Sequence, residues 1–292
     1  MKLGILGGSG QVGTALRSLH AHHSAPNSTT VDLTDRTALA GWLDTEQPDA
    51  VVNTAAMTNV PGAEDNPGLA DAINADGARH VAELCAERDL PSVLISTDFV
   101  FDGSRRTPYP EDAATGPLGA YARSKLAGEQ AALEAGSRNA ALRAGWIFSS
   151  QGPNFITAIL NRARQGEPLS VVADQHGAPC SAAAVARYAL AIAEHLRAGP
   201  AEMSVFHLES HPPTTWHGFA TVICERAHAL GLLGEVPDIT AISAAEYGGD
   251  SVERPAYTVL DGTATRSALG ISPGDWARDL DVVLPDLVPH LR

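Results

Sequence analysis

A tyrosine and a lysine four residues apart, Tyr121 and Lys125, have the clearest potential for acid-base chemistry in this sequence. They fall in a stretch with helical character, and a spacing of i and i+4 in a helix places two side chains on the same face. A phenol has a pKa of about 10 in water, and an adjacent ammonium stabilises the phenolate and lowers that pKa. The pair predicts a tyrosine that exchanges a proton with a substrate, and the alternative is an ordinary pair on a helix surface.

The lysine count favours the chemical role. The sequence has 20 basic residues, of which only Lys2 and Lys125 are lysine and the others are arginine. A chain that uses arginine almost everywhere has a reason to place lysine at position 125.

A hydroxyl group stands at the end of an apolar run that predicts a buried strand. The run covers residues 92–97 and ends with Thr97, directly before Asp98. Ligands of open parallel sheets bind at this edge, where the hydroxyl can hydrogen-bond a substrate carbonyl. The alternative is a strand-end threonine that caps a turn. We predict Thr97, Tyr121 and Lys125 as the catalytic residues.

Three glycines, Gly7, Gly10 and Gly13, follow the apolar run 3–6 and precede helix-forming residues 14–19. In this order of strand, turn and helix, glycines let the backbone approach a pyrophosphate, whose charge lies at the helix N-terminus. The alternative is a tight turn without a ligand. Together with the catalytic candidates, the turn indicates a reductase that uses a hydride from a nicotinamide and a proton from the tyrosine.

An acidic residue often lies roughly 20 positions after such a turn and holds the adenosine ribose. Asp32 stands at that distance, but the segment 21–30 before it is short and polar, so a second strand is barely present. Asp32 therefore has two interpretations, a ribose ligand or the start of a turn at 32–35 that caps the next helix.

The elements that must position these residues alternate between strand and helix. Strands are expected at residues 3–6, 49–56, 92–97 and 140–148, and helices at 14–19, 68–88, 118–135, 155–165, 183–197 and 216–230. This alternation predicts an α/β fold, a doubly wound parallel (Rossmann) sheet with a smaller C-terminal substrate lobe. We expect residues 1–150 to form the dinucleotide-binding domain, with a helix and a strand from about 170–195 returning to it, and residues 151–292 to form mostly the substrate-binding lobe.

Composition argues against several other classes of protein. The net charge is −14 and no basic cluster is longer than Arg105-Arg106, which argues against nucleic-acid binding. No apolar run approaches the roughly 20 residues that span a bilayer, and the N-terminus does not have the pattern of a signal peptide. Three cysteines without C-x-x-C spacing argue against a zinc site and a disulfide framework. A cytoplasmic protein without a membrane partner is expected.

Several blocks of sequence together are more specific than any one motif. An S-T-D-x-V-F-D-G block at 96–103 is joined to Y-x-x-x-K-x-x-G-E at 121–129, and further matching segments lie at 7–13, 52–60, 172–179 and 254–255. These residues resemble the extended short-chain dehydrogenase/reductases, and within them the dTDP-4-dehydrorhamnose reductase (RmlD-like) group. The resemblance spans nearly the whole chain.

The resemblance implies reduction of the C4 ketone of a dTDP-4-keto-6-deoxyhexose by NADPH or NADH, with dTDP-4-dehydrorhamnose converted to dTDP-rhamnose as the first expectation. It implies that Tyr121 protonates the ketone oxygen, that Lys125 lowers the pKa of this tyrosine and holds the nicotinamide ribose, and that Thr97 binds the carbonyl. The residues implied to bind the cofactor are Gly7, Gly10, Gln11, Val12, Gly13, Asp32, Leu33, Asn53, Ala55, Ala56, Thr58, Tyr121 and Lys125. Those implied to bind the nucleotide-sugar substrate are Thr58, Val60, Asp98, Phe99, Trp146 and, through the diphosphate, Arg254. The alternatives are ordinary packing for Trp146 and an ion pair with Glu253 or Asp250 for Arg254.

Departures from the family pattern leave other functions open. Phe99 stands where a tyrosine is usual and Cys180 where a threonine is common, which allows a sister 4-ketoreductase acting on another dTDP-deoxysugar of secondary metabolism. A non-catalytic regulatory subunit of the methionine adenosyltransferase beta type has the same fold. A nucleotide-sugar epimerase or dehydratase is a third alternative. Dehydration needs an extra acid and base after Asp98, and the phenylalanine at that position argues against it.

The shortened segment before Asp32 leaves the choice between NADH and NADPH open. A 2′-phosphate has no evident partner in the sequence, and His22, His23 or Arg36 would have to serve. Some relatives dimerise through a carboxylate-bound metal ion, but the helix expected at 183–197 offers only Glu194 for this purpose. We therefore expect no metal, and a homodimer is left open.

Overall fold

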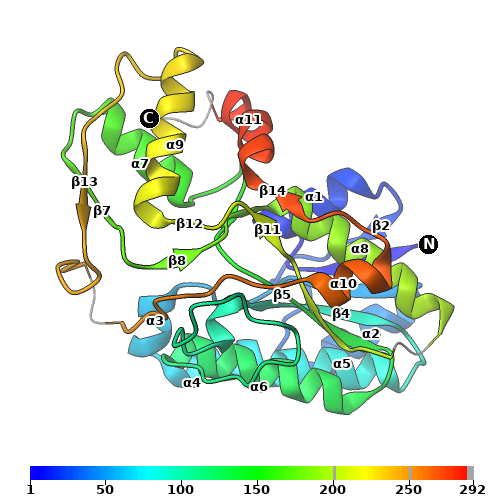
Figure 1. Ribbon diagram of the computed structural model, residues 1–292. Helices are drawn as coiled ribbons and strands as arrows, with labels where there is room; N and C mark the ends of the chain where they lie inside the picture. The colour runs from blue at the N-terminus through cyan, green and yellow to red at the C-terminus, as the bar shows by residue number, and fades with distance from the viewer. Residues whose placement is uncertain (200–201, 250–251, 288–292) are drawn as a thin grey trace.

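The computed structural model describes residues 1–199, 202–249 and 252–287, and its centre is a sheet of six parallel strands (Figure 1). The strands stand in the order β10-β5-β4-β3-β1-β2. Their bounds are β1 (Leu3–Leu6), β2 (His23–Ser24), β3 (Ala50–Asn53), β4 (Ser92–Thr97), β5 (Asn139–Ala144) and β10 (Val205–His207). Because β2 and β3 lie on opposite sides of β1, the direction of winding reverses there, and the predicted doubly wound parallel sheet is confirmed.

Helices cover both faces of this sheet (Figure 1). One face carries α1 (Gln11–Leu19) and α8 (Ala182–Ala198), and the other carries α2 (Arg36–Glu46), α5 (Ala78–Ala86) and α6 (Ala120–Ala135). Alternate strand residues divide between the faces, so that Ile5 and Val52 belong to the core under α1 and α8, whereas Leu6 and Val51 belong to the core under α2 and α5. Burial on both faces explains why the central strands read as continuous apolar runs.

A second core lies apart from the sheet, in the upper left of Figure 1. It packs α7 (Phe155–Arg164), α9 (Trp216–Ala229) and α11 (Trp276–Asp286) beside the strand pair β7 (Leu169–Val172) and β13 (Ile239–Ile242). We propose that the expected division near residue 150 corresponds to these two cores. The remaining elements are α3 (Val60–Asp65), α4 (Pro67–Asp71), α10 (Thr263–Leu269), β6 (Ile147–Phe148), β8 (His176–Gly177), β9 (Cys180–Ser181), β11 (Ser210–His211), β12 (Thr214–Thr215) and β14 (Gly274–Asp275).

Two predicted elements are wrong in detail. The strand expected at 140–148 is interrupted, because Trp146 adopts a left-handed backbone conformation with φ of 51°, and β6 beyond it pairs with β9 instead of the central sheet. A helix from the expected 170–195 segment, α8, does pack on the central sheet, but no strand there joins it, since β7 pairs with β13. The sixth strand is β10, further along the chain.

The helix expected at 68–88 is divided by a π-helical segment, Ala72–Gly77. Asn74, buried within this segment, exchanges two hydrogen bonds with the backbone of Met57 (2.8 and 3.1 Å) and donates a third to Ser124 Oγ (3.0 Å). The irregular turn thus connects the chain that follows β3 with helix α6.

Candidate active site

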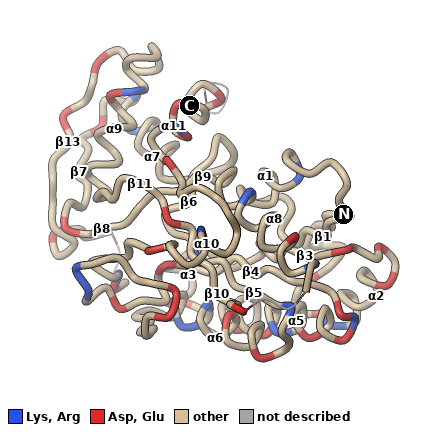
Figure 2. The backbone as a smooth tube through the Cα atoms, turned by 45° about the vertical axis from the view of Figure 1, so that its right-hand side comes forward, with Lys and Arg blue, Asp and Glu red and all other residues tan. Residues whose placement is uncertain are grey.

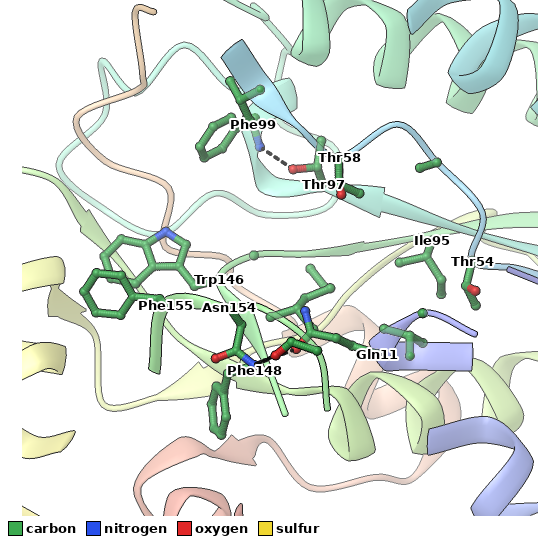
Figure 3. Close-up of a pocket in the computed structure, with 18 of the residues that line it drawn as sticks. Gln11, Thr54, Thr58, Ile95, Thr97, Phe99, Trp146, Phe148, Asn154 and Phe155 are labelled. Atoms are coloured by element: carbon green, nitrogen blue, oxygen red, sulfur yellow. Dashed lines mark hydrogen bonds between the residues drawn. The ribbon is translucent and has the colours of Figure 1, made fainter. Parts of the chain in front are cut away.

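A cleft of about 830 Å³ opens at the carboxyl ends of the central strands (Figure 3). It is lined by the glycine turn after β1, by residues after β3, by the end of β4 and by the segment that leaves β5, and the second core supplies part of its far wall. This is the edge at which open parallel sheets bind their ligands, next to the reversal between β1 and β3.

The glycine turn is closed too tightly for side chains at two of its positions. Gly7 has a left-handed φ of 77°, and a methyl group on it would lie 2.6 Å from the Ala55 nitrogen. A methyl group on Gly13 would lie 2.3 Å from the Gly7 oxygen. Gly10, at the N-cap of α1, provides no side chain to cap the helix, so the first backbone N–H groups of α1 are left for a ligand.

Gln11 ties the first turn of α1 to the start of the second core. Its Oε1 atom accepts hydrogen bonds from Ser149 Oγ (2.8 Å) and from Asn154 Nδ2 (3.3 Å), and Asn154 in turn caps α7 (Figure 3). These contacts hold the two walls of the cleft together.

Most of the predicted site residues line this cleft. They are Gly7, Gly10, Gln11, Val12, Ala55, Ala56, Thr58, Val60, Thr97, Asp98, Phe99, Tyr121, Lys125, Trp146 and Arg254. Arg254 also donates to the Val252 carbonyl oxygen (3.3 Å), and Asp250, one of its two suggested partners, lies outside the described residues.

Four predicted cofactor ligands do not line the cleft. Gly13 packs beneath the turn, and Asn53 is buried with its Oδ1 accepting from the Ala55 nitrogen (3.1 Å). Leu33 belongs to the core under α2 and α5. Asp32 opens the turn before α2, where its Oδ1 accepts from the Thr34 nitrogen (2.8 Å), while Asp35 is the residue that caps the helix.

Thr97, Tyr121 and Lys125 come together in one corner of the cleft. Thr97 ends β4, and its hydroxyl accepts a hydrogen bond from the Phe99 nitrogen at 3.2 Å (Figure 3) and donates one to Asp98 Oδ1 at 3.3 Å. Lys125 is only 3% exposed, and its ammonium donates to the Ile95 carbonyl oxygen at 2.7 Å. The Phe99 ring stands edge-on to the Tyr121 ring, with centroids 6.1 Å apart.

The predicted direction of the Tyr121 pKa is wrong. Burial raises the pKa of Tyr121 to about 12, a hydrogen bond with Thr97 lowers it in part, and the Asp98 carboxylate raises it further. Lys125 makes its hydrogen bond to the backbone of β4 and not to the phenol. Its own pKa is lowered to about 8 by burial, against which the Glu129 carboxylate acts.

Behind Lys125 lies a buried ion pair between Glu129 and Arg143. Their side chains are 2% and 5% exposed, and Arg143 Nη2 lies 2.5 Å from Glu129 Oε1. Ser96 Oγ donates to Glu129 Oε2 at 2.6 Å, and Arg143 Nη1 lies 3.3 Å from His207 Nε2. Burial and this guanidinium lower the pKa of His207 to about 3, so the ring is neutral. The Glu129 carboxylate, which acts on Lys125, is therefore held in place by its ion pair with Arg143 and by hydrogen bonds.

Asp98 stands between the catalytic candidates and the segment that leaves β5. The residue is 2% exposed, and burial raises the pKa of its carboxyl to about 7 against hydrogen bonds that lower it. A methyl group on Gly145 would lie 2.2 Å from Asp98 Oδ2, so this position needs glycine. Trp146 follows directly, and its ring lies over Gly177.

The model of the family described as RmlD substrate binding domain matches residues 1–288. The chain belongs to this family. It is 36% identical over 299 residues to a dTDP-4-dehydrorhamnose reductase of Burkholderia thailandensis, with 99% of each chain covered. It is 33% identical over 288 residues to a dTDP-4-keto-6-deoxy-D-glucose reductase of Streptomyces niveus, with 96% of each covered. Among solved structures, a dTDP-4-dehydrorhamnose reductase of Bacillus anthracis in complex with NADP superposes with a TM-score of 0.89 at 26% identity, covering 98% of this chain and 99% of the other.

Two aromatic residues of this RmlD-family cleft, Trp216 and Phe155, were not predicted as site residues from the sequence. Trp146 stacks on Trp216 of α9 with ring centroids 3.6 Å apart and planes at 5°, and Phe155 packs against Trp216 at 4.7 Å. Trp216 and Phe155 both line the cleft. The only signal for Trp216 in the sequence was its place at the start of an expected helix.

Within the described ranges, no group of three or more His, Cys, Asp or Glu side chains is placed to hold a metal ion. Among the helices of the same residues, none has the length and apolar character needed to cross a bilayer.

Proposed function

We propose that this chain reduces the C4 ketone of a dTDP-4-keto-6-deoxyhexose with NADPH or NADH, converting dTDP-4-dehydrorhamnose to dTDP-rhamnose. The observation that carries the proposal is that Thr97, Tyr121 and Lys125 meet the glycine turn in one cleft. The names of the relatives give the reaction and its substrate.

The residues present fit a dinucleotide. Gly7 and Gly13 keep side chains out of the turn, and the uncapped N-terminus of α1 offers backbone donors to a pyrophosphate. Lys125 and Tyr121 lie where the nicotinamide half would reach the end of β4, and the ammonium can donate to its ribose. When bound, the reduced nicotinamide supplies the hydride to C4.

The protein's part of the reaction is the handling of the ketone oxygen. The Thr97 and Tyr121 hydroxyls hydrogen-bond this oxygen and orient the carbonyl. With its raised pKa, the phenol of Tyr121 holds its proton at neutral pH. As C4 is reduced, its oxygen becomes an alkoxide, a stronger base than a phenolate, and takes the phenolic proton. The cationic Lys125 then stabilises the phenolate that is left.

The other end of the cleft suits the nucleotide sugar. Trp146 lines the cleft with an apolar ring that can contact the sugar, while Thr58, Val60 and Asp98 line the space beside it. The guanidinium of Arg254 can bind the diphosphate as a planar fork.

The test is NADPH oxidation with dTDP-4-dehydrorhamnose, followed by the loss of the absorbance of the reduced nicotinamide. Tyr121→Phe should lower kcat by at least about 100-fold, because general acid catalysis contributes that much. Tyr188→Phe is the matched control, since the Tyr188 hydroxyl is also buried but donates to the Ser272 carbonyl (2.9 Å) outside the cleft. Full turnover by Tyr121→Phe would refute the proposal.

A second candidate is the 4-ketoreductase of another dTDP-deoxysugar. It is favoured by Phe99, whose ring faces Tyr121 without a hydroxyl for the sugar, and by the relative from Streptomyces niveus. Comparison of kcat/KM for dTDP-4-dehydrorhamnose and dTDP-4-keto-6-deoxy-D-glucose decides between the two, and a higher value for the second sugar would establish this candidate.

We place the activity in the cytoplasm, supported by three free buried cysteines, and leave a homodimer as a prediction for sedimentation to test.

A further inference from the structure

The end of β2 is the place where a dinucleotide fold distinguishes NADH from NADPH, because the adenosine ribose lies over it. An acidic side chain there accepts from the ribose 2′-hydroxyl, and a cation there binds the 2′-phosphate. In this chain β2 ends at Ser24 and is followed by Ala25. The position directly after the strand therefore has no acid to repel a phosphate.

Arg17 of α1 stands at this corner. Its Nη1 atom donates to the Gly8 carbonyl oxygen at 3.4 Å, so the guanidinium lies against the glycine turn. A methyl group on Gly8 would lie 2.8 Å from Ala25 Cβ and 3.6 Å from Arg17 Cδ. The arginine stem, the turn and the end of β2 are thus direct neighbours, and the guanidinium is exposed to solvent beside them.

Two of the three cations suggested by the sequence, Arg36 and His23, are engaged elsewhere. Arg36 lies 2.5 Å from Glu87 and 3.7 Å from Glu83, across α2 and α5. The Nδ1 atom of His23 lies 2.8 Å from the His20 carbonyl oxygen. Arg17, in contrast, has no carboxylate within 4.0 Å among residues 1–199, 202–249 and 252–287.

A local cation matters here because the molecule as a whole repels anions. The sequence has 34 acidic residues against 20 basic ones, and the acidic positions are spread over both parts of the fold (Figure 2). The 2′-phosphate is a phosphate monoester, and such a group carries about 1.5 to 2 negative charges at neutral pH. Without a partner it would weaken binding, whereas a guanidinium can pair with two of its oxygens.

We propose that Arg17 binds the 2′-phosphate and makes NADPH the preferred cofactor. This inference rests on the proposed function, since it assumes that a dinucleotide occupies the glycine turn. In this proposal, Arg17 of α1 and the non-acidic Ala25 together determine the cofactor preference.

The experiment measures the Kd of NADPH and of NADH by calorimetry, without sugar substrate, so that it does not depend on the later chemistry. The wild-type protein should bind NADPH at least about tenfold more tightly than NADH, and Arg17→Gln should lose about tenfold in NADPH affinity while NADH changes by less than about twofold. Ala25→Asp, which places an acid at the end of β2, should weaken NADPH in the same way and leave NADH unchanged or tighter. Arg36→Gln is the matched control and should change neither.

Salt gives an independent readout. Raising the ionic strength should weaken NADPH binding more than NADH binding in the wild type, and Arg17→Gln should remove most of this difference. An unchanged NADPH affinity in Arg17→Gln overturns the role of Arg17 while leaving the proposed function standing. Failure of the wild type to bind either nucleotide overturns both.

Discussion

Replacing Glu129 by glutamine should show how much the buried ion pair behind Lys125 contributes to the stability of the protein. Glu129 Oε1 lies 2.5 Å from Arg143 Nη2 and 3.1 Å from Arg143 Nε, and both side chains are at most 5% exposed. In the variant, a neutral amide faces a buried guanidinium that has lost its counter-ion. Removal of one partner from a buried pair costs about 3–5 kcal/mol in free energy of unfolding, because the other charge is left uncompensated.

That loss is large enough to measure in two ways. An unfolding entropy of about 2.1 cal/mol/K per residue gives about 0.6 kcal/mol/K for the 292 residues, so Tm should fall by about 5–8 °C. Urea titration should give the same loss as a lower midpoint with an unchanged slope. Asp76→Asn is the control, since it breaks an ion pair of 2.6 Å with Arg79 whose side chains are 52% and 44% exposed, and it should change stability by less than about 1 kcal/mol.

The double variant Glu129→Gln/Arg143→Met separates the pair from its parts. With the uncompensated charge removed, it should be more stable than Glu129→Gln by at least about 2 kcal/mol. If the double variant instead loses the sum of the two single losses, the two side chains are not coupled and the argument fails. A Glu129→Gln variant as stable as the wild type would also contradict it.

Three further predictions concern pH and packing. Burial lowers the pKa of Lys125 from 10.5 to about 8, so the native state releases this proton first as the pH rises. The free energy of unfolding should therefore rise by about 3 kcal/mol between about pH 8 and 10.5, relative to Lys125→Met. Burial raises the pKa of Asp98 from 3.8 to about 7, so the unfolded chain loses this proton first as the pH rises. The wild-type protein should therefore lose stability as the pH rises from about 4 to 7. Urea titrations at each pH should show a smaller loss in Asp98→Asn. Trp216→Leu removes the ring stacked on Trp146 at 3.6 Å, and it should cost at least about 1 kcal/mol in stability and raise KM for the sugar nucleotide more than it lowers kcat.

The sequence allowed prediction of those parts of the site that depend on local pattern. The glycine turn is an example, since the spacing of Gly7, Gly10 and Gly13 after an apolar run specifies a strand, a turn and a helix N-terminus. Tyr121 and Lys125 are another, because helical periodicity alone places them on one side of α6. In both cases the residues that matter are close in the chain.

The parts that were missed depend on contacts between distant segments. The stack of Trp146 on Trp216 joins the end of β5 to α9, and the left-handed backbone of Trp146 has no signature in the sequence, because glycine would be the usual residue there. Likewise the ion pair of Glu129 and Arg143 joins α6 to β5, and the sequence shows only two charged residues in different elements. Burial, which decides what such residues do, is a property of the assembled fold.

The pKa of Tyr121 shows how burial changes the chemical reading of a motif. The i,i+4 spacing suggested an acidified phenol, yet burial and the nearby Asp98 raise its pKa to about 12. A raised pKa keeps the phenol protonated at neutral pH, so Tyr121 is a poor base but carries a proton. Protonation of a developing alkoxide needs that proton to be present when the hydride arrives, and it needs no prior ionisation. Oxidation of an alcohol is the reverse of this step, with the phenolate as the base. The raised pKa of Tyr121 therefore suits the proton-donating role that reduction requires, and reduction is the reaction that the names of its relatives describe.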